Sequence, residues 1–362
     1  HLITTIAKKA VFNMITKRQQ QILNLIISLY TQTHKAVESK ALMTSISASS
    51  ATIRNDMKTL ETLGFIQKEH TSSGRVPSVT GYKYFVENFL KPGKLDNNDV
   101  YQVMKRFDGE FYKLDVLYQQ AAQILSDMTG FSAFILNVSL KNQILSKFDI
   151  VQLDSHSAMA VMTLDTGLVK TMQFSLPRSM TLDDLTTFKF ISDERLVGKR
   201  ILDIHYSLLT EIPQVAQKYF VMTTDVLQLF DHVFSDLFKE NLISAGRQNL
   251  LEYSDDVVSL YKILMDDEAI IHEIRDTVSD DEIRSVKFDS SLTENHQISK
   301  NITLMTQQFV VPYRGLGTLA LMGPVDLDYQ KVVSTMDLVA KILTMKLSDY
   351  YRYLDGNHYE VI

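Results

Sequence analysis

The chain has 362 residues, a formal net charge of −6 and no cysteine. Its length predicts two to three domains, each with a substantial core, and the lack of cysteine excludes disulfides and thiol chemistry. No stretch approaches the roughly 20 apolar residues of a membrane span and no signal-peptide pattern is present, so we expect a cytoplasmic protein. We interpret residues 1–13 as an extension outside the fold, with a basic arm as the alternative.

The first predicted elements are two helices joined by a turn. Thr16 can cap a helix that runs to about Thr33. Its apolar positions share one face: Ile22, Leu25, Ile26, Leu29 and Tyr30. A short second helix fits Glu38 to Thr44, and Ile46 is the apolar residue of the Ser-rich turn that follows. This arrangement is typical of the first part of a helix-turn-helix.

A third helix, capped by Ser49 or Ser50, has the composition of a DNA recognition helix. Its buried stripe has spacings of four, three and four: Ile53, Met57, Leu60 and Gly64. Small residues at its start permit a close approach to the major groove, while Arg and Asn side chains can read base edges and Lys can meet phosphate. The helix N-terminus also favours a phosphate. The DNA contacts that we predict here are Ser49, Ser50, Ala51, Thr52, Arg54, Asn55 and Lys58.

A hairpin follows the third helix and predicts a wing. Gly64 is a plausible left-handed helix stop, and Phe65–Lys68 and Arg75–Pro77 are two short strands around a Ser- and Gly-rich tip. Backbone amides, hydroxyls and a guanidinium suit phosphate or minor-groove contact. The wing residues that we predict to bind DNA are Lys68, His70, Thr71, Ser73, Gly74 and Arg75.

Charge separates DNA binding from the alternative, in which the helix pair contacts protein and Arg54 and Lys58 form a solvated face. Residues 14–90 contain nine Lys and Arg against five Asp and Glu, whereas residues 91–362 carry a net charge of −12. A basic module on an acidic body is expected when one domain meets a polyanion. The predicted DNA-binding domain spans residues 14–90.

A linker and a long helical pattern follow. A helix from Ser78 to Leu90 ends before Lys91-Pro92-Gly93, which places a domain boundary near residue 91. Apolar residues from Val100 to Met128 then alternate spacings of four and three, which predicts one long helix. The helix can form a coiled coil between subunits or lie against a sheet, and its bulky Phe and Tyr residues favour the sheet.

Short apolar runs then predict strands. They lie at Phe131–Val138, Phe148–Leu153, Ala158–Leu164, Leu168–Phe174, Ile283–Phe288, Thr303–Val311 and Gly317–Met322, before a final helix from Asp328 to about Arg352. We predict an antiparallel sheet domain with helices over 91–177 and 241–352, interrupted by a mainly helical insertion over 178–240. The fold class is therefore α+β and multidomain.

The last helix of the insertion is apolar around much of its circumference. Its most apolar positions are Val226, Phe230, Val233, Phe234 and Leu237. An arc of this width requires burial on two sides. Neighbouring helices of the same chain or a second subunit can supply it, and the pattern does not separate the two.

Several motifs resemble the heat-inducible transcription repressor family HrcA. The Thr-Ile-Arg-X-Asp core at Thr52 to Asp56 is shared with sugar-responsive repressors of the DeoR type, so it is weak alone. The more specific segments are 70–78, with His70-Thr71-Ser72-Ser73-Gly74-Arg75-Val76-Pro77-Ser78, and 81–86, with Gly81-Tyr82-Lys83-Tyr84-Phe85-Val86. The matching C-terminal segments are 312–317, 319–324 and 328–333.

The resemblance implies a function for each part. The sheet domain is then GAF-like, and the insertion dimerises the protein, which puts Val226, Phe230, Val233, Phe234 and Leu237 at the subunit interface. The homodimer represses chaperone operons at an inverted-repeat operator in double-stranded DNA, and the chaperonin GroEL modulates it. The alternative is a winged-helix repressor controlled by a small effector in the GAF-like domain.

Catalytic motifs are missing from the sequence. It contains no Walker A loop, Rossmann glycine fingerprint, His-Glu-X-X-His helix or Gly-X-Ser-X-Gly elbow. The nine His are scattered without partners at metal-ligand spacing. We therefore expect no enzyme activity, no cofactor and no metal.

Overall fold

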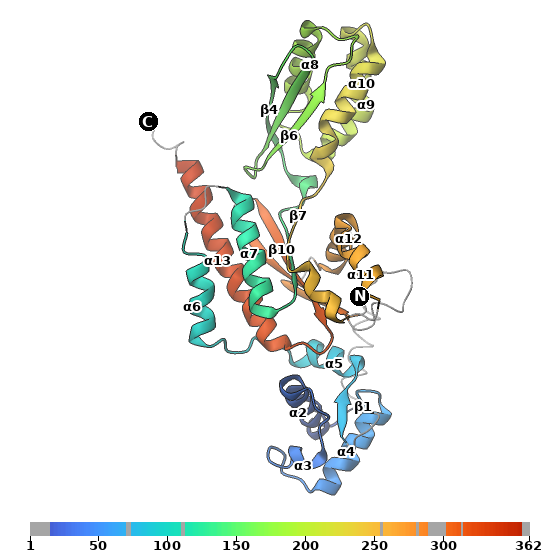
Figure 1. The fold of residues 1–362 in the computed structure, drawn as a ribbon, viewed down its shortest axis with the longest axis vertical. Coiled ribbons are helices and arrows are strands. Elements are labelled where there is room, and N and C mark those ends of the chain that lie inside the picture. Colours follow the sequence, from blue (N-terminus) through green and yellow to red (C-terminus); the bar gives the residue numbers. More distant parts are fainter. Residues whose placement is uncertain are drawn as a thin grey trace.

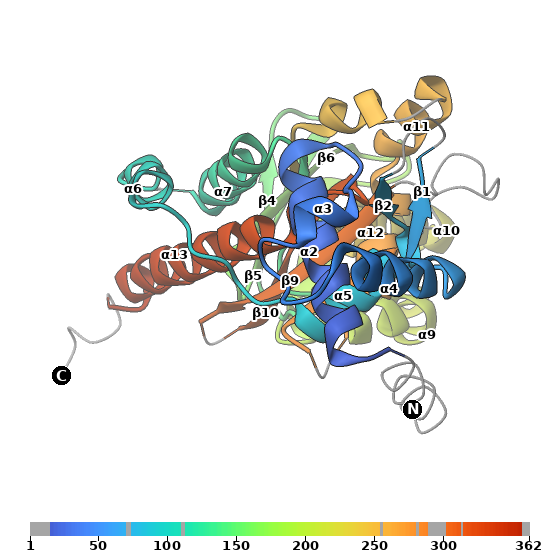
Figure 2. The same ribbon diagram turned by 90° about the horizontal axis from the view of Figure 1, so that it is seen from below.

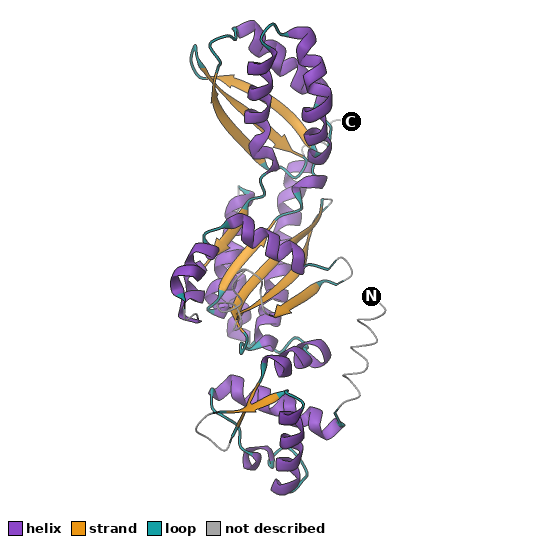
Figure 3. Ribbon diagram, turned by 90° about the vertical axis from the view of Figure 1, so that its right-hand side faces the viewer, coloured by secondary structure: helices purple, strands orange, loops and turns teal. Residues whose placement is uncertain are grey.

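The structure is a computed structural model that describes residues 15–69, 74–109, 113–253, 256–279, 282–288, 302–312 and 314–356. The molecule is elongated, with a small helical domain at one end, a sheet domain in the middle and a second sheet unit at the other end (Figures 1 and 3). In the described part of the chain, no helix is both long and apolar enough to cross a bilayer.

The N-terminal domain is a winged helix. Its elements are α2 (Lys17–Thr33), α3 (Ser39–Leu42), α4 (Ser50–Thr62), β1 (Ile66–Lys68), β2 (Arg75–Pro77) and α5 (Val79–Phe89). Thr16 forms a capping box with Gln19 at the start of α2. Ile22, Ile26 and Ile53 are fully buried where α2 packs on α4. The predicted helix-turn-helix and hairpin are confirmed.

Two glycines are needed for this local geometry. Gly64 follows α4 with a φ of +78°, so it is the left-handed stop that the sequence predicted. Gly81 lies in α5 against the wing, and a Cβ atom there would be 2.1 Å from the carbonyl oxygen of Phe65. A side chain at residue 81 would therefore separate α5 from the start of the wing.

The central domain is built on a five-stranded antiparallel sheet with the order β7-β3-β10-β9-β8. Its strands are β3 (Ser132–Leu136), β7 (Leu242–Ala245), β8 (Arg284–Phe288), β9 (Ile302–Val311) and β10 (Gly315–Pro324). Residues alternate between two cores, since Ile135 packs with α7 (Leu114–Thr129) and α13 (Tyr329–Gly356), while Phe134 packs with α11 (Val257–Leu264) and α12 (Asp267–Thr277). Helices thus cover both faces of the sheet.

The single helix expected from Val100 to Met128 is instead two helices, α6 (Asn97–Arg106) and α7. The α7 face with Tyr118 and Leu125 is buried against the sheet and α13, as expected for a helix on a sheet. A coiled coil between subunits through this face is therefore excluded. The spacing therefore predicted the buried face of α7 correctly, but it did not show that α6 and α7 are separate helices.

The three strands from residue 145 to 175 do not join the central sheet, which corrects the predicted domain division. They form a separate antiparallel sheet, β4 (Leu145–Gln152), β5 (Ser157–Leu164) and β6 (Val169–Ser175). Helices α8 (Leu182–Arg195), α9 (Ile201–Tyr219) and α10 (Thr223–Ser235) share its core, which runs from Leu140 to Leu237. The insertion, called the inserted unit below, therefore begins near residue 140 and combines helices with a sheet.

The wide apolar arc of α10 is buried inside this unit. Its five predicted interface residues have exposed fractions of 1% or less: Val226, Phe230, Val233, Phe234 and Leu237. The ring of Phe230 lies 4.2 Å from that of Phe188 on α8, and the ring of Phe234 stacks 5.3 Å from that of Phe148 on β4. The same chain thus covers both sides of α10, so these side chains are not a subunit interface.

Candidate nucleic-acid interface

Helix α4 lies in the winged helix at one end of the molecule, which Figure 2 views from below. One face of the helix is buried and the other is polar and exposed. Ile53, Met57 and Leu60 are buried as predicted. The residues exposed on the other face are Ala51, Arg54, Asn55 and Lys58, with Ser50 half-buried beside them. A short side chain, a guanidinium, an amide and an ammonium group are therefore available on one helical surface, which fits major-groove recognition.

The inner face of α4 contains a buried carboxylate that fixes the helix. Asp56 is 5% exposed. It accepts a 2.6 Å hydrogen bond from Nε of Arg18 and a 3.2 Å hydrogen bond from Nε2 of Gln19, both on α2. The Oγ atoms of Ser39 and Ser50 lie 3.2 Å apart and link α3 to α4. These contacts hold the recognition helix at a fixed angle to the rest of the domain.

The start of α4 is capped as predicted, and this changes what two of the expected contact residues do. Oγ of Ser49 accepts a 3.2 Å hydrogen bond from the amide of Thr52, and the two hydroxyl oxygens lie 2.9 Å apart. Both side chains therefore stabilise the helix end. The positive end of the helix dipole still faces outward beside Ala51, where it favours a phosphate.

The structure places Arg75 in an ion pair rather than on an open surface. Its Nε and Nη2 atoms lie 3.0 and 2.9 Å from Oε2 of Glu61 at the end of α4, and its side chain is 16% exposed. Its backbone also pairs with Val37. The guanidinium that we expected at a phosphate is therefore paired with Glu61 and links the wing to α4. The sequence could not show this pair, because paired and free guanidinium groups look the same in a sequence.

The remaining wing residues divide into three groups. Lys68 is exposed, as a DNA contact requires. Gly74 is buried, and a Cβ atom there would lie 2.7 Å from Cβ of Ala36, so glycine is required by packing rather than by DNA. The predicted contacts His70, Thr71 and Ser73 lie outside the described residues.

Sequence reasoning also missed the pairs that position α4, namely Asp56 with Arg18 and Glu61 with Arg75. A signal for the first pair exists. Asp56 lies three residues after Ile53 and next to Met57, on the stripe that must be buried. A carboxylate at a buried position requires a cation or hydrogen-bond donors nearby. That reasoning predicts a partner but does not identify Arg18.

A helix-turn-helix with a polar recognition helix and a hairpin wing defines a winged-helix DNA-binding regulator. Residues 14–88 match the family described as "Winged helix-turn-helix transcription repressor, HrcA DNA-binding", and residues 115–333 match "HrcA protein C terminal domain". The chain belongs to the HrcA family of heat-inducible transcription repressors, which are DNA-binding proteins and not enzymes.

Relatives support this over nearly the whole chain. Heat-inducible transcription repressor HrcA from Lactococcus lactis subsp. lactis (strain IL1403) is 58% identical over 349 residues, which cover 96% of this chain and 99% of the relative. The HrcA of Lactococcus lactis subsp. cremoris (strain SK11) is 57% identical over 349 residues, which again cover 96% of this chain and 99% of the relative. The crystal structure of a hypothetical protein has a TM-score of 0.57 at 18% identity, covering 92% of this chain and 99% of its own, which shows a shared fold.

Proposed function

We propose that the protein binds an inverted-repeat operator as a homodimer and represses chaperone operons from there, within the cytoplasm. The exposed face of α4 with Arg54, Asn55 and Lys58 is the observation that supports it best. One winged helix reads a few base pairs, whereas two copies related by a twofold axis read an inverted repeat with a fixed separation. The identity of the regulated operons rests on the family resemblance.

We propose that α9 provides the subunit contact in place of α10. Besides its buried stripe, α9 has a second apolar stripe with spacings of four, three and four: Leu202, Tyr206, Leu209 and Pro213. Tyr206 is 58% exposed and Leu209 is 63% exposed. We propose that a second copy of the chain covers this stripe, because an inverted repeat requires two DNA-binding domains. The spacing of the stripe also matches that of paired helices.

The test is a double variant, Tyr206→Asp with Leu209→Asp. Light scattering should show a monomer, and binding to the full inverted repeat should weaken strongly while binding to a half-site stays unchanged. Gln214→Asp is the matched control, since Gln214 is exposed on α9 away from the stripe, and it should remain dimeric. A double variant that is still dimeric would contradict the α9 contact.

We also propose that the chaperonin GroEL maintains the active form of the repressor. Chaperonins bind exposed apolar groups, and the inserted unit exposes several, including Val221 at 98%. Operator binding by purified protein should rise when chaperonin is added and fall irreversibly after brief heating without it. Binding that is full, reversible on heating and indifferent to chaperonin would contradict this regulation.

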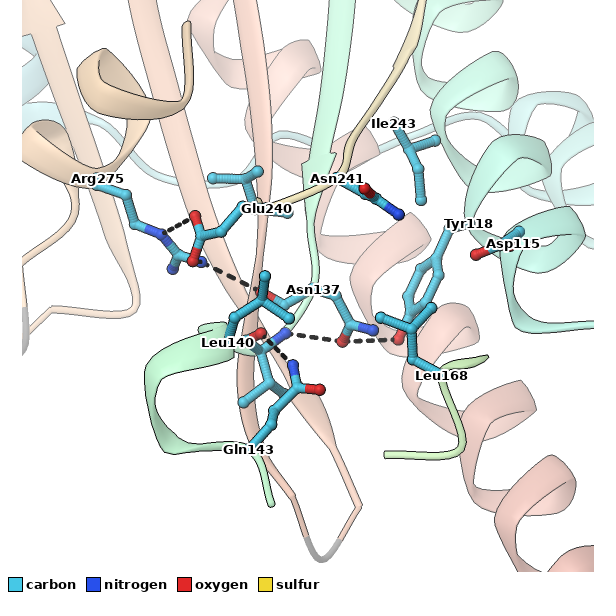
Figure 4. Close-up of a pocket in the computed structure, with 12 residues that line it drawn as sticks. Asp115, Tyr118, Asn137, Leu140, Gln143, Leu168, Glu240, Asn241, Ile243 and Arg275 are labelled. Carbon is cyan, nitrogen blue, oxygen red and sulfur yellow. Dashed lines mark hydrogen bonds and ion pairs between the residues drawn. The ribbon is translucent and has the colours of Figure 1, made fainter. Parts of the chain in front are cut away.

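The second candidate is control by a small effector, favoured by a cavity at the edge of the central domain (Figure 4). The cavity lies among Asp115, Tyr118 and Asn137 on one side and Glu240 and Arg275 on the other. Several of its polar side chains bond to one another, which favours a structural role. A thermal-shift screen of metabolites separates the candidates, because an effector raises the melting temperature by mass action.

A further inference from the structure

The inserted unit is attached to the central domain at the joint where the chain crosses between them. The chain enters the unit after β3, at residues 137–139, and leaves it before β7, at residues 239–241. Two neighbouring crossings by themselves form a hinge, about which the unit can rotate. Contacts from the central domain on both sides of this joint oppose such rotation.

The first contact comes from the sheet face that α11 and α12 cover. Arg275 on α12 donates from Nη2 and Nε to the carboxylate of Glu240, at 3.0 and 3.3 Å. Its Nη2 atom also lies 3.4 Å from the carbonyl oxygen of Asn137. Because Glu240 and Asn137 belong to different crossings, one guanidinium holds both (Figure 4).

The second contact comes from the elements of the opposite face and from the β9–β10 hairpin. Arg314, between β9 and β10, donates from Nε to the carbonyl oxygen of Asp165 at 2.6 Å. Tyr351, on α13, donates from its hydroxyl to the carbonyl oxygen of Thr166 at 2.7 Å. The guanidinium carbon of Arg314 lies 3.8 Å from the centre of the Tyr351 ring. Tyr351 and Thr166 are almost completely buried.

The turn that receives these bonds is fixed to its own unit. The amide of Asp165 donates to the carbonyl oxygen of Ile144 at 2.9 Å, and the amide of Ile144 donates to Oδ1 of Asp165 at 3.0 Å. The hydroxyl of Thr166 donates to Oε1 of Gln143 at 2.8 Å. The β5–β6 turn therefore moves with the inserted unit, so holding the turn holds the whole unit.

We propose that Arg314 and Tyr351, together with Arg275 on the other side, form a clamp that sets the orientation of the inserted unit and thereby the separation of the two half-sites that the dimer reads. The second half of this statement rests on the proposed dimerisation through the inserted unit. The unit and the winged helix lie at opposite ends of the long axis (Figure 1). A small rotation at the joint is therefore a large displacement of the DNA-binding domain.

A distance measurement tests the clamp without DNA. The chain has no cysteine, so Thr186→Cys on α8 and Lys341→Cys on α13 provide unique sites for a pair of spin labels. Labelled protein is diluted with excess unlabelled protein, so that the distances come from within one protomer of the proposed dimer. We expect one narrow distance distribution in the parent protein and a broader or shifted one in Arg314→Ala and in Tyr351→Phe, which keeps the ring and removes the hydroxyl. Distributions unchanged in both variants would overturn the clamp.

Arg247→Ala is the matched control. Arg247 donates from Nη1 to the carbonyl oxygen of Leu264 at 2.6 Å and lies 5.8 Å from the centre of the Phe134 ring, all within the central domain. Its loss removes a guanidinium–carbonyl hydrogen bond and a ring contact, as the loss of Arg314 does, and also an ion pair with Asp267, but all of these lie within the central domain and none crosses the joint. The distance distribution should therefore stay as in the parent, and equal broadening in the control would contradict the clamp.

The operator readout uses inverted repeats whose spacer is lengthened by about five base pairs, half a helical turn. The parent protein should prefer one spacing, and Arg314→Ala should lose that preference while binding a half-site equally well. A broadened distance distribution with the spacing preference intact would overturn the link from the clamp to the operator. If the parent protein binds no inverted repeat as a dimer, the proposed function fails, and the spin-label result still decides the clamp.

Discussion

Replacement of Phe230 by alanine distinguishes a core position from a subunit contact. The Phe230 side chain is 1% exposed, and its ring lies 4.2 Å from that of Phe188 and 6.2 Å from that of Phe234. Truncating a buried Phe removes its transfer free energy and leaves a cavity, a cost of about 3–5 kcal/mol. Leu209→Ala on the exposed stripe of α9 should change the unfolding free energy of the protomer by less than about 0.5 kcal/mol.

Urea unfolding followed by circular dichroism measures the difference. With a slope of about 1–3 kcal/mol per molar urea, Phe230→Ala should lower the midpoint of the transition that includes the inserted unit by roughly 1 M or more. Protein concentration must be equal in all samples, because subunit association adds to apparent stability. If Phe230→Ala unfolds at the parent midpoint and instead dissociates the dimer, the burial of α10 within one chain is refuted.

Three further variants test the DNA-binding domain. Arg54→Ala should lower operator affinity by ~1–3 kcal/mol and leave random-DNA binding intact in a gel-shift assay, whereas equal losses would make Arg54 a phosphate contact. Arg75→Ala removes the ion pair with Glu61, so it should weaken binding to all DNA. The slope of log affinity against log salt concentration should stay as in the parent protein, whereas the loss of a phosphate contact would lower it by ~1 unit. Gly81→Ala places a Cβ atom 2.1 Å from the carbonyl oxygen of Phe65. It should lower stability by about 1–3 kcal/mol in a thermal melt, and an unchanged melting temperature would contradict this packing.

The winged helix is the part of the fold that the sequence predicted best, because its signals are local. Helix α4 is defined by signals that lie within it or next to its ends. They are the cap at Ser49, the buried stripe from Ile53 to Leu60 and the left-handed stop at Gly64. The hairpin strands followed from the same kind of signal. The helix-turn-helix could therefore be predicted without knowing which distant residues contact each other.

The inserted unit was predicted less well, because strand pairing is a long-range property. The alternation of Ala158, Ala160 and Met162 on β5 shows that one sheet face is buried, but it does not say which helices bury it. Strands β3 and β4 are separated by a short segment and yet belong to different sheets. For the same reason, the wide apolar arc of α10 indicated that the helix is buried on two sides, but it did not show that both sides are covered by the same chain.

The candidate site was likewise predicted only in its exposed half. The polar face of Arg54, Asn55 and Lys58 followed from helical periodicity, which also determines exposure. The ion pairs that orient this face join residues 14 and 38 positions apart, at Arg75 with Glu61 and Arg18 with Asp56. The buried position of Asp56 indicates that it needs a partner, but no local pattern identifies Arg18, and Glu61 and Arg75 are each compatible with a solvated surface.

A footprint of the dimer on the chromosomal DNA of its source tests whether two copies of α4 read one operator. We expect two protected half-sites in inverted orientation, with centres separated by a whole number of helical turns of about 10 base pairs, ahead of chaperone operons. Arg54→Ala should lose this protection while retaining weak binding along the DNA. Protection of single sites without a symmetric partner, or uniform protection in both proteins, would contradict operator reading by two copies of α4.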